Sequence, residues 1–326
     1  MRVSWSRLAG LMAGVLVGAL FLVLAFQGTP PRSVGRILAG GDWGWPALQV
    51  LAGTAVFVYA KSARWRLLLG GRGAPSTLTL LRPVTAGLAL NALVPHAGEF
   101  VRAFALQRRH GYAASAVLSS IVAERVFDLF GVLILAAGAL ALVPVSPALY
   151  ASVRVLALFA AALALCVLAA VAVPHLVRRM AVMLLRPLPA RLHDMLLTHV
   201  DAALTGLAPV RSPATSLAVL AWSLLQWLAV AVCAAGAAAV AGHAIGAGPA
   251  LLVVVGIVVA FLLPNAPGYA GSVQVAFRLA LEPAGVPADA ALAASFVYQL
   301  LMVLPLIVFG LAWLRASLGR TAASAP

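Results

Sequence analysis

Polar and ionisable side chains gather at three short segments of a chain that is otherwise strongly apolar. These segments read LNALVPHAGEFVR, VAERVFD and LLPNAPGYAGSVQ. Ionisable groups inside apolar segments are costly and usually functional. A guanidinium group recognises phosphate, whereas a carboxylate recognises a cationic group. The side chains that we expect to line a binding path are Asn91, His96, Glu99, Arg102, Glu124, Arg125, Asp128, Asn265, Tyr269, Ser272 and Gln274.

The charged segment VAERVFD allows three interpretations. On a helix, Glu124 and Asp128 share one face, and Arg125 lies three residues before Asp128. Near a membrane boundary, Glu124 and Arg125 would simply extend to water. Alternatively, the three residues form a structural salt-bridge cluster, or they contact a substrate or a proton.

In the uncharged third segment, Ser272 either lines the path or caps a half-helix.

The composition indicates that membrane-spanning helices carry these residues. Of the 326 residues, 64% are hydrophobic and only 9% are charged, and the mean hydropathy is +1.07. A soluble domain carries roughly 25% charged residues. The apolar runs are about twenty residues long, which is the length that a helix needs to cross the bilayer. We therefore predict an all-α polytopic membrane protein, with residues 1–326 forming a single integral membrane domain.

Six apolar runs are predicted to cross the membrane fully, and two others are interrupted. The run after Arg2 and Arg7 is long for a signal peptide and has no clear cleavage site, so we expect it to be an uncleaved span. The predicted spans are residues 8–26, 45–60, 126–143, 151–173, 214–240 and 288–314. The interrupted stretches, 78–112 and 249–283, contain proline, glycine and polar residues at their centres.

The distribution of basic residues predicts the topology. The formal net charge of +14 does not indicate nucleic-acid binding, because the basic residues flank apolar spans in short loops. There they orient the protein and meet anionic head groups at the cytoplasmic face. Most basic residues fall on one face if both interrupted stretches enter and leave the membrane by the same side. This arrangement predicts a protein of the plasma (inner) membrane with both termini in the cytoplasm.

The two interrupted stretches resemble each other and predict an inverted repeat. Residues 87–95 and 256–264 each read Gly, seven residues, then Pro. The first stretch opens to the cytoplasm and the second to the outside in the predicted topology. Residues 45–143 and 214–326 therefore form two repeats of opposite orientation, each with a re-entrant hairpin. Residues 1–44 supply the first span and loop, and residues 144–213 supply a linking span and a cytoplasmic amphipathic segment.

Each broken helix predicts a binding site. Proline ends a helix, and irregular backbone at membrane depth is tolerated only where protein or a wet cavity satisfies it. The second half-helix of each hairpin starts inside the membrane with unpaired N–H groups, which attract anions. The phosphate of a lipid is the obvious anion in this setting.

The sequence contains no motif for metal binding, nucleotide binding or nucleophilic catalysis. The six histidines have no metal-binding spacing, and Cys166 and Cys233 lie in apolar runs as small hydrophobic residues. No phosphate-cradling loop or nucleophile motif is present. We therefore expect no catalytic residue, metal or cofactor. The segment RLHDMLLTHVDAALTGL is predicted to be a helix lying in the membrane interface.

Several runs resemble a known family. RWRLLLGG, LNALVPHAGEFVRAFAL and SSIVAERVFDLFGVLIL are similar to the flippase-like transmembrane domain of lysylphosphatidylglycerol synthases and their stand-alone relatives. LLPNAPGYAGS resembles the second signature of that family, P-x-x-P-G-x-x-G. The resemblance begins near residue 45. It adds the motif positions Pro95, Gly98, Pro264, Pro267, Gly268 and Gly271 to the expected site.

The resemblance implies a domain that moves modified lipids between leaflets. The soluble aminoacyl-transferase domain is missing, so we do not expect this chain to make lysyl-lipid. Ser272-Val273-Gln274 stands where an acid often follows the second signature, which puts a cationic substrate contact there in doubt. The favoured hypothesis is a lipid translocator for a phospholipid or polyprenyl-linked substrate. The alternatives are an accessory scaffold for a lipid-modifying enzyme and a membrane-embedded transferase.

Overall fold

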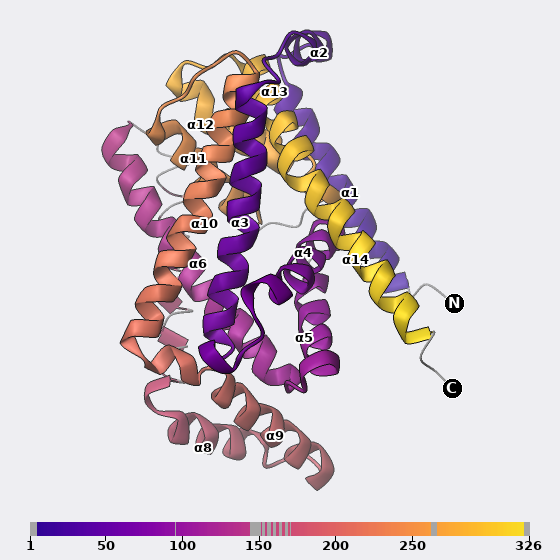
Figure 1. Cartoon of the computed structure of the whole chain (residues 1–326), viewed down its shortest axis with the longest axis vertical. Helices are drawn as coiled ribbons and strands as arrows, with labels where there is room; N and C mark the ends of the chain where they lie inside the picture. Colours follow the sequence, from indigo (N-terminus) through magenta and orange to yellow (C-terminus); the bar gives the residue numbers. More distant parts are fainter. Residues whose placement is uncertain are drawn as a thin grey trace.

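The computed structural model describes residues 5–94, 96–143, 171–261 and 266–322, together with scattered positions between 151 and 169. All regular structure in these ranges is helical (Figure 1). Most of the predicted span 151–173 lies outside the described residues, as do Pro95, Pro264 and Asn265. The helices are α1 (Trp5–Phe26), α2 (Pro31–Ala39), α3 (Trp45–Leu68), α4 (Thr77–Leu93), α5 (Ala97–His110), α6 (Ala114–Leu142), α8 (Pro174–Leu185), α9 (Ala190–Gly206), α10 (Pro213–Val240), α11 (Ala247–Phe261), α12 (Ser272–Leu281), α13 (Ala288–Tyr298) and α14 (Leu304–Ala322), with short 3₁₀ turns η1 (Gly71–Gly73), η2 (Ala208–Arg211), η3 (Pro267–Tyr269) and η4 (Glu282–Ala284).

Within the described residues, three helical stretches are long and apolar enough to cross a membrane: Ala114–Leu142, Pro213–Val240 and Ala288–Ala316. The third joins α13 to α14 through one π-helical turn, η5 (Gln299–Val303). These stretches confirm the spans predicted near 214–240 and 288–314. They also confirm the span predicted near 126–143, although α6 begins twelve residues earlier, at Ala114. Many leucines of these helices are exposed, as lipid-facing side chains must be.

Helix α3 extends beyond its predicted end at residue 60. It continues to Leu68, and Lys61 and Arg64 within this extension are buried. The expectation that these two cations lie in a loop is therefore wrong. The physical reason is that acidic partners on α6 hold them in the interior, as the functional site shows below.

The helices break in the two stretches where the proline and glycine residues predicted an interruption. Helix α4 ends at Leu93 and α5 begins at Ala97, while α11 ends at Phe261 and α12 begins at Ser272. The two helices of each pair pack against each other. Figure 1 places α4 and α5 in the lower half of the molecule, where α3 ends and α6 begins. It places α11 and α12 in the upper half, where α10 ends and α13 begins.

Helices α3 and α10 pack closely along each other and form the frame for both pairs. A Cβ atom on Gly53 would lie 2.6 Å from the Sγ atom of Cys233. A Cβ atom on Gly236 would lie 2.9 Å from the carbonyl oxygen of Pro46. Glycines at these two points therefore permit the close approach of the two backbones.

Candidate functional site

Five charged side chains from three helices meet in the interior. Helix α3 contributes Lys61 and Arg64, α5 contributes Arg102, and α6 contributes Glu124 and Asp128. Each is at most 6% exposed, and Arg64 and Glu124 are fully buried. We call these five residues the buried ion-pair cluster. Charges at such depth require partners, because an isolated buried charge costs far more than a buried ion pair.

Glu124 forms ion pairs with all three cations of the cluster. Its Oε2 atom lies 2.6 Å from Nη2 of Arg102. Its Oε1 atom lies 3.0 Å from Nη2 of Arg64 and also accepts a bond from Nζ of Lys61. One carboxylate thus joins α3, α5 and α6, and the interpretation in which Glu124 extends to water is wrong.

Asp128 joins α6 to α3 and α10. Its Oδ1 atom accepts bonds from Nη1 of Arg64 at 2.5 Å, Nε2 of Gln226 at 3.1 Å and Nε1 of Trp227 at 3.1 Å. Its Oδ2 atom lies 3.2 Å from Nη2 of Arg64. Arg64 also donates to the hydroxyl of Ser223 at 2.8 Å. The hydrogen-bonding capacity of Asp128 is therefore largely used by the fold.

The buried ion-pair cluster carries more positive than negative formal charge. Lys61, Arg64 and Arg102 face only the two carboxylates of Glu124 and Asp128. Among the described residues, no acceptor reaches Nε of Arg64 or Nε of Arg102. The guanidinium carbon of Arg102 lies 4.0 Å from the ring centre of Trp65, whose Nε1 atom donates to Ser120 at 3.1 Å. The cluster therefore has the charge and a free donor for one additional anion.

A second ion pair lies beside the cluster. Nη2 of Arg125 donates to Oε1 of Glu99 at 2.6 Å, so Arg125 pairs with α5 and not with the carboxylates on its own helix. The Arg125 side chain is 46% exposed, whereas that of Glu99 is 12% exposed. His96 lies 3.7 Å from Glu99, with an exposed side chain. The 3₁₀ turn η3, which contains Tyr269, contacts α4. The second helix break therefore lies against the first helix pair.

The first break is held by an amide and two glycines. Oδ1 of Asn91 accepts a bond from the backbone N–H of Gly98 at 2.7 Å, which caps the start of α5. A Cβ atom on Gly98 would lie 1.9 Å from the carbonyl oxygen of Gly87. A Cβ atom on Gly87 would lie 2.9 Å from the Arg102 side chain. This tight crossing brings Arg102 to the buried ion-pair cluster. The side-chain oxygen of Asn91 binds the backbone of α5.

The second break is held by two glutamines. Oε1 of Gln274 accepts a bond from the N–H of Gly271 at 2.8 Å, and Nε2 of Gln274 donates to Gln299 at 2.5 Å. Nε2 of Gln299 donates to the carbonyl oxygen of Gly268 at 2.9 Å. Ser272 donates to the carbonyl oxygen of Tyr269 at 3.0 Å. Gln299 lies in the π-helical turn, a distortion that is frequent at functional sites.

The predicted site is thus brought together only in part. Arg102, Glu124 and Asp128 lie in the buried ion-pair cluster, Glu99 and Arg125 lie beside it, and Pro267 is exposed in η3. The sequence interpretation missed several partners. Lys61 and Arg64, spaced i, i+3 at the end of an apolar run, offered a signal, because buried acids on α6 require buried cations. The other missed residues are Ser223, Gln226, Trp227 and Gln299.

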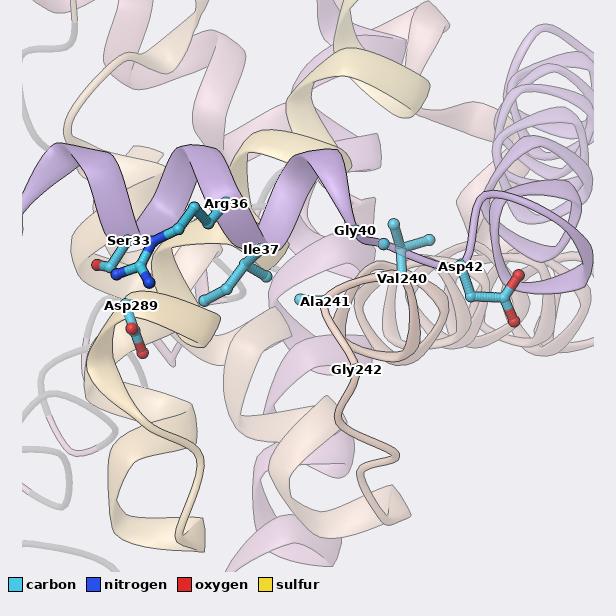
Figure 2. A pocket seen from close by; sticks show the side chains of 10 residues that line it. Ser33, Arg36, Ile37, Gly40, Asp42, Val240, Ala241, Gly242 and Asp289 are labelled. Atoms are coloured by element: carbon cyan, nitrogen blue, oxygen red, sulfur yellow. The ribbon is translucent and has the colours of Figure 1, made fainter.

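A cavity of about 530 Å³ opens at the end of the molecule where α2 lies, away from α8 and α9 (Figures 1 and 2). Figure 2 shows Ser33, Arg36 and Asp289 on one side of it and Asp42 beyond Val240. Both carboxylates bind local backbone: Asp42 accepts from Gly44 at 3.0 Å, and Asp289 accepts from Ala290 at 2.9 Å. None of the predicted site residues lines this cavity. We therefore take the buried ion-pair cluster as the candidate functional site.

Long apolar helices around a buried charge network define a multi-pass α-helical membrane protein. A profile described as the lysylphosphatidylglycerol synthase TM region matches residues 11–310. The chain belongs to this family. No curated protein and no solved structure matches the chain.

Proposed function

We propose that the protein moves a phosphate-containing or modified lipid between the two leaflets of the bacterial inner membrane. The observation that carries this proposal is the excess positive charge of the buried ion-pair cluster beside the first helix break. A lipid phosphate supplies the missing negative charge. The free Nε of Arg102 supplies a donor for it.

The helix pairs provide a path through the membrane in this proposal. Pairs α4–α5 and α11–α12 act as re-entrant hairpins of an inverted repeat that enter from opposite faces, with both chain termini in the cytoplasm. Their positions in opposite halves of the molecule support this arrangement (Figure 1). The contact between η3 and α4 supports a meeting of the two tips near the membrane centre. Transporters with inverted repeats bind their substrates at such a place.

An apolar space accompanies the polar path. A cavity of about 150 Å³ lies between α1, α11 and α12, and Phe21, Leu252, Val259 and Leu279 are among its lining residues. An acyl or polyprenyl chain matches this lining because both are apolar. The lipid head group follows the ion pairs while its hydrocarbon chain stays in contact with apolar surface or bilayer.

Translocation in this proposal is an exchange of ion pairs and involves no covalent step. The phosphate competes with Glu124 for Arg102 and then meets Arg125, which pairs with Glu99 beside the buried ion-pair cluster. Because both partners of each pair stay within the protein, the site returns to its resting state when the lipid leaves. The protein therefore needs no catalytic residue, and we propose that it is not an enzyme.

One observation favours an accessory role as the second candidate. Asp128 is bonded to three other side chains at once, which suits a rigid frame on which a lipid-modifying enzyme docks. The same pairing disfavours an embedded transferase, because a base or metal ligand must be free. Within the described residues, no three His, Cys, Asp or Glu side chains form a group that could hold a metal ion.

Native mass spectrometry with lipid analysis tests the proposed function. The purified wild type is compared with Arg102→Ala and with Arg108→Ala, an exposed arginine on the same helix. We expect one enriched lipid class in the wild type and in Arg108→Ala, and its loss in Arg102→Ala. Bulk phospholipid that is unchanged by Arg102→Ala would contradict the proposal and favour the accessory role.

A further inference from the structure

Helix α8 carries an apolar stripe that the protein leaves uncovered. Leu176, Met180, Met183 and Leu184 are 46%, 54%, 68% and 74% exposed. Their spacing of four, seven and eight residues places them on one face of the helix. Four large exposed side chains within twelve residues form a continuous patch, and such patches mark interaction surfaces.

Basic residues flank this stripe. At 3.6 residues per turn, Arg179 and Arg186 lie along one edge of the apolar face, and both are exposed. Arg178 lies on the opposite face, where its Nε atom donates to Asp201 of α9 at 2.8 Å. This ion pair, together with the packing of α8 on α9, fixes which face of α8 is free.

The position of α9 sets the depth of this stripe. Figure 1 shows α8 and α9 across the lower end of the helix bundle. Gly206 of α9 packs on the first turn of α6, because a Cβ atom there would lie 2.4 Å from the carbonyl oxygen of Ala116. Helix α6 has 29 residues, and its length of about 43 Å exceeds the roughly 30 Å of hydrocarbon. The first turns of α6, and α9 with them, therefore lie at head-group level.

We propose that α8 is a peripheral binding site for anionic lipid, separate from the buried ion-pair cluster. The apolar stripe enters the boundary between head groups and acyl chains, and Arg179 and Arg186 contact lipid phosphates. The depth of α9 places the stripe beside the bilayer, and the flanking cations match an anionic leaflet. The bilayer surface is therefore the occupant of this face.

Site-specific fluorescence in nanodiscs tests this proposal on the full chain. Cys166 is replaced with alanine, and Cys233 stays because it is buried. An environment-sensitive NBD label is attached through Met183→Cys on the stripe or, as the control, through Asp194→Cys on α9. The Asp194 side chain is 79% exposed, and its charge identifies it as water-facing. The discs contain either phosphatidylcholine alone or phosphatidylcholine mixed with phosphatidylglycerol.

In the mixed discs, we expect blue-shifted emission at position 183, with quenching by head-group spin-labelled lipid and protection from aqueous iodide. At position 194, we expect emission without the blue shift, no quenching by the spin-labelled lipid, and quenching by aqueous iodide. Protection at position 183 should weaken in phosphatidylcholine alone and, in the mixed discs, with the double variant Arg179→Gln and Arg186→Gln. Equal iodide quenching at positions 183 and 194 in the mixed discs would overturn the proposal. The anionic-lipid assignment would be overturned if protection of position 183 from iodide were the same in both kinds of disc and unchanged in the double variant.

Discussion

At the residue scale, Arg64 and Asp128 are more closely tied to the fold than to any substrate. Arg64 is fully buried, donates to Asp128 and Ser223, and forms an ion pair with Glu124. Arg102, by contrast, bonds a single carboxylate among the described residues, and its guanidinium carbon lies 4.0 Å from the ring centre of Trp65. We therefore propose Arg102 as the cation of the buried ion-pair cluster that a lipid phosphate shares.

Loss of the Asp128 charge should destabilise the protein strongly. Asp128→Asn keeps the side-chain shape but leaves Arg64 without one of its two carboxylate partners. Breaking a buried pair in this way costs about 3–5 kcal/mol. Thermal unfolding in detergent should show a large drop for Asp128→Asn and almost none for Asp194→Asn, the exposed control. A melting temperature equal to that of the wild type would show that Asp128 carries no structural charge.

At the element scale, the first hairpin depends on backbone contact between α4 and α5. Gly87 and Gly98 meet where a side chain on Gly98 would collide with the carbonyl oxygen of Gly87. Asn91 also caps α5 from α4. Because Arg102 lies one turn beyond Gly98, the crossing sets the position of Arg102 in the buried ion-pair cluster.

Gly98→Ala should separate α4 from α5. Overpacking of this kind costs about 1–3 kcal/mol or more, and the displaced α5 should carry Arg102 away from Glu124. The expected result is a lower melting temperature together with loss of the enriched lipid class. Gly73→Ala, in η1 with open space around it, is the matched control and should change neither. Full lipid retention by Gly98→Ala would argue against a site positioned by this crossing.

At the scale of the whole molecule, the central structural proposal is that two hairpins enter the membrane from opposite faces. Residues before and after each hairpin should then lie on one side. Cysteine accessibility in sealed cells tests this with an impermeant maleimide, in the Cys166→Ala background. Arg72→Cys and His110→Cys, which flank the first hairpin, should label only from the cytoplasmic side. Ala244→Cys and Ala284→Cys, which flank the second, should label only from outside.

A different labelling pattern would identify a different topology. If positions 72 and 110 label from opposite sides, the first pair crosses the membrane and the inverted repeat is lost. The Asp194→Cys variant serves as the internal reference for the face that carries α8 and α9.

The sequence predicted the elements of the fold better than the partners within the site. Proline and glycine placed both helix breaks correctly, because their effects on the backbone are local. The partners of Glu124 and Asp128 were missed, because Lys61 and Arg64 lie far away in sequence and follow an apolar run that was itself predicted to span the membrane. Placing Lys61 and Arg64 in a cytoplasmic loop agreed with the expected excess of basic residues on the cytoplasmic face. Only the folded arrangement of α3 beside α6 shows that they are buried.

The proposed translocation is measured as lipid exchange between leaflets in reconstituted vesicles. The probe is a fluorescent analogue of the lipid class that co-purifies with the protein, and its exchange between leaflets is followed by quenching of the outer leaflet. We expect faster exchange with wild type and Arg108→Ala than in protein-free vesicles, and no acceleration with Arg102→Ala. Equal exchange in protein-free and wild-type vesicles would contradict translocation. Equal acceleration by Arg102→Ala would contradict the role of the buried ion-pair cluster.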